Sequence, residues 1–363
     1  MAAGDAGAAT AVHGWQYRVL HSFGDPTDHR GGGASPSGDL LMTDAGGIYG
    51  SCSAGGRFAG GTIYSVNPGG GISCLHSFAE GDVQGWRPMG RLTLGTDGAV
   101  YGVTGLGGES SGGVVFRFGL DGAYDRLTSF SSNNGGNPRT GLVLATDGNF
   151  YGTTFLGGTE NGGTIYRMTP QGELTTIHSF TRKEGQMPAA ALIQGTDGNL
   201  YGTTGSYGVN RYGAAFQCTL DGHLKVLHSF AGIEGGYPLG PLVEGPDQQF
   251  YGTTQSGGDC WLGSAFRVGA DGAFKSLHSF CAESRVGVYP NDGLSVGDDG
   301  LLYGTTESAV FSMSLNGRPR VLRAGLPNSK GALLQADPDT WLGVAPTGGK
   351  FDKGLLYELR RKA

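Results

Sequence analysis

Several charged residues interrupt a recurring set of small tripeptides, each of which precedes a Leu or Ala that opens a predicted strand. Four of them are Asp39, Arg91, Arg139 and Asp292, and Glu307 follows a strand in the repeat whose loop is shortest. If these segments meet, their carboxylates could move a proton while the guanidinium groups stabilise developing negative charge. The alternative is a ring of salt bridges that only holds the segments together. We predict these five as candidate catalytic residues of a metal-independent lyase, isomerase or cyclase.

A second set combines aromatic and cationic side chains in loops that differ from repeat to repeat. Aromatic rings stack on sugar rings, and Arg binds carboxylates in a bidentate way. We therefore expect an acidic glycan or a small organic molecule as the ligand, and ordinary loop aromatics on a polar surface are the alternative. The candidate ligand-binding residues are Trp86, Arg87, Tyr207, Arg211, Tyr212, Tyr237, Trp261, Tyr289 and Lys330.

Metal and cofactor chemistry is not expected. No His, Asp or Glu cluster with ligand spacing is specific to one repeat. The cysteines form no CxxC pair. Cys260 and Cys281 lie in the same repeat, and a disulfide between them would favour an oxidising compartment. The sequence leaves open whether they are bonded or are buried free thiols.

An internal repeat of about 50 residues indicates the elements that position these residues. A Tyr-Gly dipeptide begins at Tyr49, Tyr101, Tyr151, Tyr201, Tyr251 and Tyr303, and Trp341-Leu342-Gly343 is a shorter seventh copy. A His-Ser-Phe motif or a relative begins at His21, His76, Thr128, His178, His228 and His278. No linker interrupts this rhythm, so we expect one domain over residues 15–360 and a flexible tail over 1–14.

Each repeat divides into four short strands. In one copy they are Leu192–Gln194, Leu200–Thr204, Ala214–Leu220 and Leu224–Phe230, and Asp-Gly turns join the first pair and the last pair. Four strands in 40 to 50 residues are typical of a β-propeller blade. Six complete blades and a final three-stranded unit predict an all-β, seven-bladed β-propeller. Its last blade would be completed by the N-terminal strand, residues 17–23, which protects the open edges.

The two faces of this propeller should differ. The turns between the first two and the last two strands of each blade are short and uniform, and their Asp residues fit Asx-turn hydrogen bonding better than calcium binding. The repeated His residues occupy one position in five blades, which favours packing between blades over catalysis. The loops of the opposite face vary, and there we expect the site.

The motifs LHSF, GTDGNLYGTT and GGT-[IV]-[YF] resemble the glycine-rich tandem repeats of the bacterial GloVer family, from about Tyr17 to Leu359. The resemblance implies a propeller and often an exported protein. It implies no common activity and therefore no catalytic residues.

Charge and hydropathy limit the partners. The net charge is −6 and no basic run appears, which argues against nucleic acid, and no apolar run is long enough to span a membrane. Residues 1–14 lack the basic and apolar regions of a signal peptide, so they could begin a mature exported chain or a cytosolic one. We predict a secreted or periplasmic monomer, with the cytoplasm as the alternative.

Three functions remain open. The first is the ligand-binding or acid/base propeller described above. The second is a non-catalytic protein-interaction scaffold, which an extended apolar rim patch would favour. The third is a glycoside hydrolase, which requires two carboxylates about 5 to 9.5 Å apart.

Overall fold

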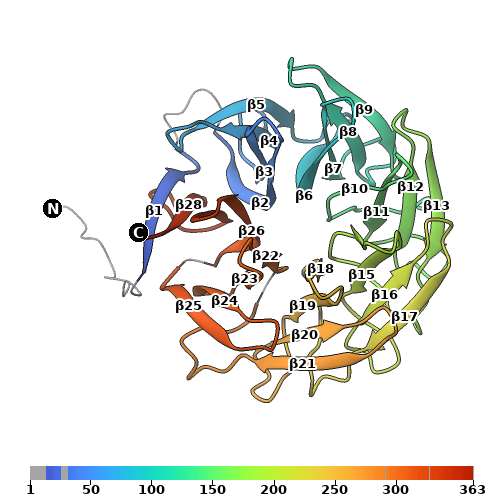
Figure 1. The fold of residues 1–363 in the computed structure, drawn as a ribbon. Coiled ribbons are helices and arrows are strands. Elements are labelled where there is room, and N and C mark those ends of the chain that lie inside the picture. The colour runs from blue at the N-terminus through green and yellow to red at the C-terminus, as the bar shows by residue number, and fades with distance from the viewer. Residues whose placement is uncertain (1–13, 26–31, 291, 327, 363) are drawn as a thin grey trace.

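Asp-Gly turns between β-branched and aromatic runs produce antiparallel strands that follow one another along the chain. The computed structural model describes residues 14–25, 32–290, 292–326 and 328–362, without the side chain of Lys330. These residues form strands and no helix, arranged as seven four-stranded antiparallel sheets in a ring (Figure 1). The predicted seven-bladed β-propeller is therefore confirmed. The predicted tail, apart from Gly14, lies outside the described residues.

The first three blades run outward from the axis in chain order. The first contains β2 (Ala34–Met42), β3 (Ile48–Ala54), β4 (Ala59–Val66) and β5 (Ile72–Ala79). The second contains β6 (Trp86–Leu94), β7 (Val100–Leu106), β8 (Val114–Phe118) and β9 (Tyr124–Ser129). The third contains β10 (Val143–Leu144), β11 (Phe150–Thr154), β12 (Thr164–Met168) and β13 (Leu174–Ser179).

The next three blades repeat this order. The fourth contains β14 (Ile193–Gln194), β15 (Leu200–Thr204), β16 (Ala214–Cys218) and β17 (Leu224–Ser229). The fifth contains β18 (Val243–Glu244), β19 (Phe250–Thr254), β20 (Ser264–Val268) and β21 (Phe274–Ser279). The sixth contains β22 (Ser295–Val296), β23 (Leu302–Thr305), β24 (Ala309–Met313) and β25 (Pro319–Ala324).

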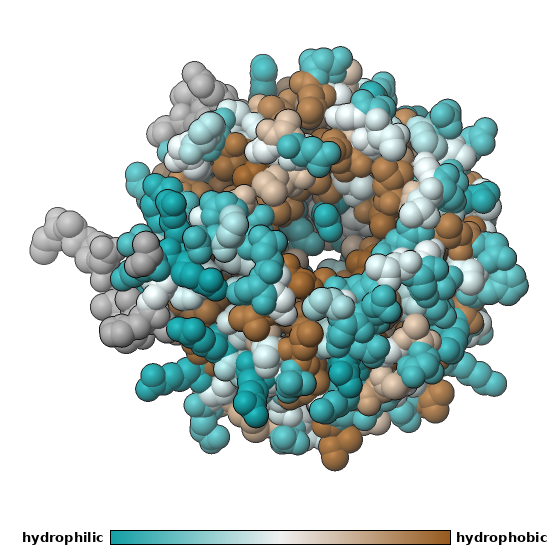
Figure 2. Space-filling view, in the orientation of Figure 1, coloured by the Kyte–Doolittle hydropathy of each residue, from teal (hydrophilic) through white to brown (hydrophobic). Residues whose placement is uncertain are grey.

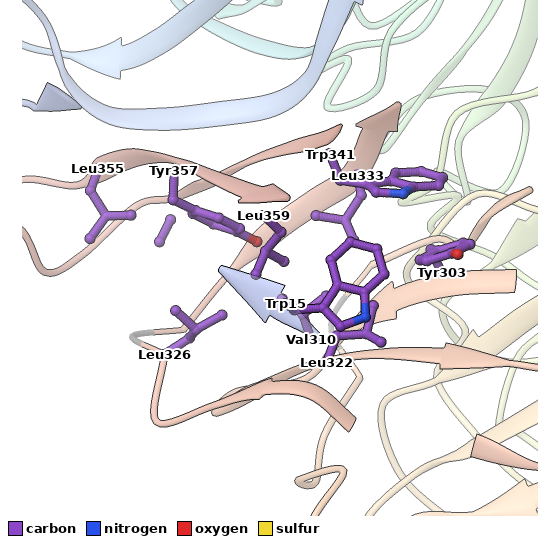
Figure 3. Packing of buried hydrophobic residues seen from close by; sticks show 11 residues of the cluster. Trp15, Tyr303, Val310, Leu322, Leu326, Leu333, Trp341, Leu355, Tyr357 and Leu359 are labelled. Atoms are coloured by element: carbon purple, nitrogen blue, oxygen red, sulfur yellow. The ribbon is translucent and has the colours of Figure 1, made fainter. Parts of the chain in front are cut away.

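The seventh blade joins the two ends of the chain. It contains β26 (Lys330–Asp337), β27 (Thr340–Ala345) and β28 (Leu355–Arg361), with β1 (Trp15–Ser22) as the outer strand. The β1–β28 register runs from Trp15 opposite Arg361 to Ser22 opposite Leu355. Trp15 packs in a buried cluster with side chains of the sixth and seventh blades (Figure 3). The predicted closure by the N-terminal strand is thus confirmed.

The repeated aromatic residues pack one blade against the next. The Tyr201 ring stacks on Phe250 of the following blade with ring centroids 3.7 Å apart, and Tyr303 stacks on Trp341 at 4.1 Å. Likewise the His228 ring lies 3.6 Å from the Phe274 ring, nearly parallel to it. These contacts agree with a structural role for the repeated Tyr and His.

The turn aspartates also have a structural partner. The Tyr201 hydroxyl donates to Asp197 Oδ2 at 2.7 Å, and the Asn199 N–H donates to Asp197 Oδ1 at 3.0 Å. The same Tyr–Asp pair recurs at Tyr151 with Asp147. In the third and fourth blades, the Asp of the turn between the first two strands therefore fastens the Tyr of the second strand.

We expect Asp197→Ala to lower the free energy of unfolding by about 1 kcal/mol, because the Tyr201 hydroxyl loses its acceptor. Burial raises the pKa of Asp197, but hydrogen bonds from Asn199 and Tyr201 outweigh it and hold that pKa below its usual value. The stabilisation is therefore present above about pH 4 and is lost as the pH falls through the lower folded-state pKa. Denaturant unfolding at several pH values measures both effects.

The control is Asp271→Ala, in a turn between the last two strands, where the described acceptor contact is the Ala273 N–H alone. We expect a smaller loss there. Equal losses in the two variants would show that the Tyr hydroxyl contributes nothing.

Candidate functional site

A pocket of about 420 Å³ lies at the axis where the inner strands begin. All seven blades contribute residues that precede or lie in their first strands. The polar side chains lining it are Ser37, Asp39, Arg87, Arg91, Arg139 and Asp292, among others. Figure 2 shows a hollow at the centre of the ring. We call this pocket the funnel; it brings together four of the five candidate catalytic residues.

Close approach of neighbouring strands explains why most of the lining is small. A Cβ on Gly90, whose φ is +69°, would lie 2.3 Å from the backbone nitrogen of Gly141 in the next blade. No ordinary side chain fits there, and the backbone conformation also favours Gly. Long charged side chains therefore stand out from a wall of backbone and small residues.

The Arg91 charge acts on Asp39 and opposes the rise in the pKa of that carboxyl, but no funnel carboxylate forms a salt bridge with a funnel arginine in the described residues. Within the described part of the chain, Arg87, Arg91 and Arg139 form no salt bridge. The Arg139 guanidinium instead lies 3.8 Å from the centroid of the Phe155 ring. Burial and the nearby charge of Arg87 both lower the pKa of Arg139. The Arg139 Nε–H also donates to Asn137 Oδ1 at 3.4 Å, so the cations at this mouth are positioned without being held in salt bridges in the described residues.

The two funnel carboxylates bind backbone amides of β26. The Gly331 N–H donates to Asp292 Oδ2 at 2.7 Å, and the Ala332 N–H donates to Asp39 Oδ1 at 2.6 Å. Consecutive backbone nitrogens are less than about 4 Å apart, so the two accepting oxygens lie within about 9 Å of each other. The first and sixth blades therefore hold the seventh blade between them through these carboxylates.

The surroundings of Asp39 favour the protonated form of its carboxyl. Burial raises the pKa of the Asp39 carboxyl above its usual value, although the Arg91 charge and the Ala332 N–H oppose this. A carboxyl with a raised pKa can hold or accept a proton nearer to neutral pH than an exposed one.

Glu307 and Lys330 differ from the other predicted residues. Glu307 is exposed and does not line the funnel. The side chain of Lys330 lies outside the described residues. Its backbone, however, pairs with Val344 as Met89 pairs with Val103, so Lys330 occupies the Arg139 position, three residues before the buried Leu333. The sequence alignment of the seventh blade, which counted Ala332 as the equivalent of that Leu, is therefore wrong by one residue.

The predicted ligand-binding residues are distributed over the loop face. Arg87 lines the funnel, whereas Tyr207, Arg211 and Tyr237 line a separate pocket. Trp86 and Tyr212 pack against buried clusters of the blades. The Trp261 side chain is 56% exposed, and Tyr289 is partly buried; both lie outside these two pockets. The sequence analysis did not single out Gln255 and Thr140 of the funnel wall, because neither is charged or aromatic.

Beyond the funnel, the axis opens into a second chamber of about 660 Å³. Asp39, Arg91, Ala191 and Pro241 line both spaces, so they form the waist between them. The chamber wall is formed largely by Leu, Val and Ile residues of the inner strands. A ligand held by its charge at the waist would meet a polar side and an apolar side.

Cys260 and Cys281 form a disulfide, which answers the question that the sequence left open. It ties the loop after β19 to the second residue after the last strand of the same blade. The three other cysteines, Cys52, Cys74 and Cys218, are not disulfide-bonded.

Two further features concern the described residues as a set. They contain no group of three or more His, Cys, Asp and Glu side chains arranged to hold a metal ion. Nor does any stretch of them form a helix with the length and hydropathy needed to cross a bilayer.

Comparison with known proteins supports the repeat and the fold. The model of the Gloeobacter/Verrucomicrobia repeat matches residues 4–145 and 121–315. No curated protein sequence matches significantly.

Solved structures with the same fold belong to proteins that are named for different functions. An extracellular domain of a hybrid two-component system from B. thetaiotaomicron matches with a TM-score of 0.63 and 8% identity, over 94% of this chain and 40% of that one. A gluconolactonase from Xanthomonas campestris matches with a TM-score of 0.50 and 12% identity, over 96% and 90%. A puromycin hydrolase matches with a TM-score of 0.57 and 15% identity, over 88% and 50%. At these identities the likeness shows the fold alone.

We expect Asp39→Asn to raise the melting temperature at pH 7, because Asn keeps an acceptor for the Ala332 N–H and removes a partly buried charge. A raised carboxyl pKa means that the folded state binds the proton more tightly than the unfolded state. Stability is therefore lost as the pH rises from the unfolded-state pKa, about 4, through the folded-state pKa. The gain in the variant should vanish in acid, as thermal unfolding across pH would measure.

Asp39→Ala is the matched variant, since it removes both the charge and the acceptor. We expect it to melt below Asp39→Asn at every pH. A lower melting temperature of Asp39→Asn than of wild type at pH 7 would mean that attraction to Arg91 exceeds the burial cost.

Proposed function

We propose that this chain, which belongs to the Gloeobacter/Verrucomicrobia repeat family, functions through its funnel by binding a small organic anion that carries a carboxylate. The observation that carries this proposal is a set of guanidinium groups, those of Arg87, Arg91 and Arg139, that line one pocket and form no salt bridge in the described residues. Guanidinium groups bind carboxylates through paired hydrogen bonds, and a confined site strengthens them.

The size and the wall of the funnel support a small ligand. Its volume of about 420 Å³ lies within the range of small-molecule sites. The arginines lie on strand β6 and on the segment just before β10, and tight packing around the axis limits their movement. A site on such rigid elements is already ordered before the ligand arrives.

A second candidate function is conversion of the bound anion by proton transfer. The raised pKa of Asp39 favours it, because such a carboxyl can accept a proton from a carbon next to the ligand's carboxylate. Arg91 and Arg139 would then stabilise the enolate that forms, as in a lyase, isomerase or cyclase. Glycoside hydrolysis by Asp39 and Asp292 is less well supported, because each carboxylate already accepts a backbone amide. A non-catalytic protein scaffold is a further alternative, which the exposed apolar side chains of the variable loops, among them Val209, Ile233 and Trp261, would favour.

We further propose that the protein is exported and acts as a monomer. The Cys260–Cys281 bond supports an oxidising compartment. The extracellular location of the domain from B. thetaiotaomicron is consistent with this.

Binding is tested by a thermal-shift screen of di- and tricarboxylates and sugar acids, run on wild type and on Arg91→Ala/Arg139→Ala. We expect a ligand that raises the melting temperature of wild type by several degrees and that of the double variant not at all. The control is Arg57→Ala/Arg285→Ala, which removes two exposed cations of the same face outside the funnel. An equal shift in the funnel variant, or no hit among these anions, would overturn the proposal.

Catalysis is tested on the ligand so found, by following exchange of its carbon-bound protons in D2O with NMR. We expect wild type to catalyse the exchange, and Asp39→Asn to abolish it with the affinity changed less than threefold. Exchange at the wild-type rate in Asp39→Asn would rule out Asp39 as the proton carrier and leave the binding proposal standing.

A further inference from the structure

A further pocket, distinct from both the funnel and the chamber, lies on the loop face between the third and fifth blades. We call it the rim pocket. Its volume is about 820 Å³, and its wall is formed by Arg182, Lys183, Ser206, Tyr207, Gly208, Val209, Arg211 and Tyr237. It shares no lining residue with the funnel. Three cations and two phenol rings on one small surface are unusual in a chain whose net charge is −6.

The positive charge of the rim pocket is not neutralised by salt bridges within the described residues. In the part of the chain that the structure describes, Arg182, Lys183 and Arg211 form no salt bridge. The acidic group of the same loop, Glu184, instead accepts hydrogen bonds from the Thr181 N–H and hydroxyl. The cations are therefore available to an external anion.

The walls of the rim pocket are fixed by hydrogen bonds between loops. The Arg182 N–H donates to Glu160 Oε2 at 2.9 Å, and the Arg182 carbonyl accepts the Gly208 N–H at 2.9 Å. The Tyr237 N–H donates to the Tyr212 carbonyl at 2.8 Å. Four loops of neighbouring blades are thus held in one arrangement, which suits a preformed site.

Tyr207 is the clearest sign that this pocket is selected for binding. Its carbonyl accepts the Gly213 N–H, and five other repeats place a Gly at the same hydrogen-bonded position: Gly55, Gly107, Gly157, Gly257 and Gly348. All six have a positive φ, which is +58° at Tyr207. Tyr is unfavourable in this conformation, whereas Gly is not. A strained aromatic residue where the repeat provides Gly points to a functional constraint.

The geometry suits a sugar that carries an acid group. The Tyr207 and Tyr237 side chains are 36% and 39% exposed, so a ring can stack on them. The Arg182 guanidinium lies 5.8 Å from the centroid of the Tyr207 ring, next to where a stacked ring would present its carboxylate. We propose that the rim pocket is a separate binding site for an anionic sugar unit of a glycan chain, carboxylated or sulfated.

Binding is measured by titration calorimetry with a short oligosaccharide of uronic acid units, at low and at physiological salt. Further probes are the same chain with its carboxylates reduced to alcohols, a sulfated oligosaccharide and oligoglutamate. We expect wild type to bind the uronate or the sulfated chain, more weakly as salt rises, and to bind neither the reduced chain nor oligoglutamate. Preference between the uronate and the sulfated chain identifies the anionic group. Equal binding of oligoglutamate would overturn the sugar assignment.

Two variants distinguish the rim pocket from the funnel. Arg182→Ala/Arg211→Ala should weaken binding of the preferred oligosaccharide at least tenfold, whereas Arg91→Ala/Arg139→Ala should leave it within twofold. Arg57→Ala/Arg285→Ala, which removes the same charge elsewhere on this face, should also leave it unchanged. If the rim variant binds like wild type, the proposal is wrong, whatever the funnel binds.

Tyr207→Gly tests stacking without risk to the fold, because it restores the residue that the other repeats carry. We expect an unchanged or higher melting temperature and at least fivefold weaker binding of the oligosaccharide. Full affinity in this variant would show that charge alone holds the ligand and would contradict the role given to the ring.

Discussion

Close contact between neighbouring inner strands is the constraint on which the rest of this molecule depends. Backbone meets backbone around the axis, as at Gly90 against Gly141, and little space remains for side chains. Blades can close into a ring of seven only if these positions stay small, and the outer aromatic stacks then hold the spacing between blades. A long charged residue such as Arg91 survives here only where it can point into the open axis. The same constraint therefore builds the fold and creates the funnel.

The charged residues around the axis divide into two roles that the sequence could not separate. A ring of mutual salt bridges was one expectation, yet the carboxylates of Asp39 and Asp292 bind amides of β26 and the funnel arginines form no salt bridge in the described residues. The carboxylates thus serve closure of the seventh blade, and the arginines remain available to a ligand. Asp39 belongs to both groups, since it lies at the waist next to Arg91 and has a raised pKa.

The repeat made the architecture predictable, whereas the candidate site lies where individual copies depart from the repeat. Strand β15 begins and ends where the sequence placed it, at Leu200 and Thr204, because tight turns and Tyr-Gly motifs mark both ends. The seventh blade was misaligned by one residue, because its degenerate repeat hides the register that pairs Lys330 with Val344. The hydrogen bonds from two consecutive amides of β26 to Asp292 and Asp39 join segments that are far apart in sequence. No local sequence pattern encodes such contacts. Tyr207 did carry a local signal, a Tyr where other copies have Gly, but only the positive φ shows that it is strained.

Pairing of β1 with β28 has a consequence for how the chain is made. Trp15 leaves the ribosome long before its partner Arg361 is synthesised. The first strand must wait, unpaired, through the synthesis of the other blades, and six blades can form only an open arc with two exposed edges. Such edges invite pairing with other chains. The ring can therefore close only after the seventh blade has been synthesised, and the nascent chain is exposed to aggregation until then.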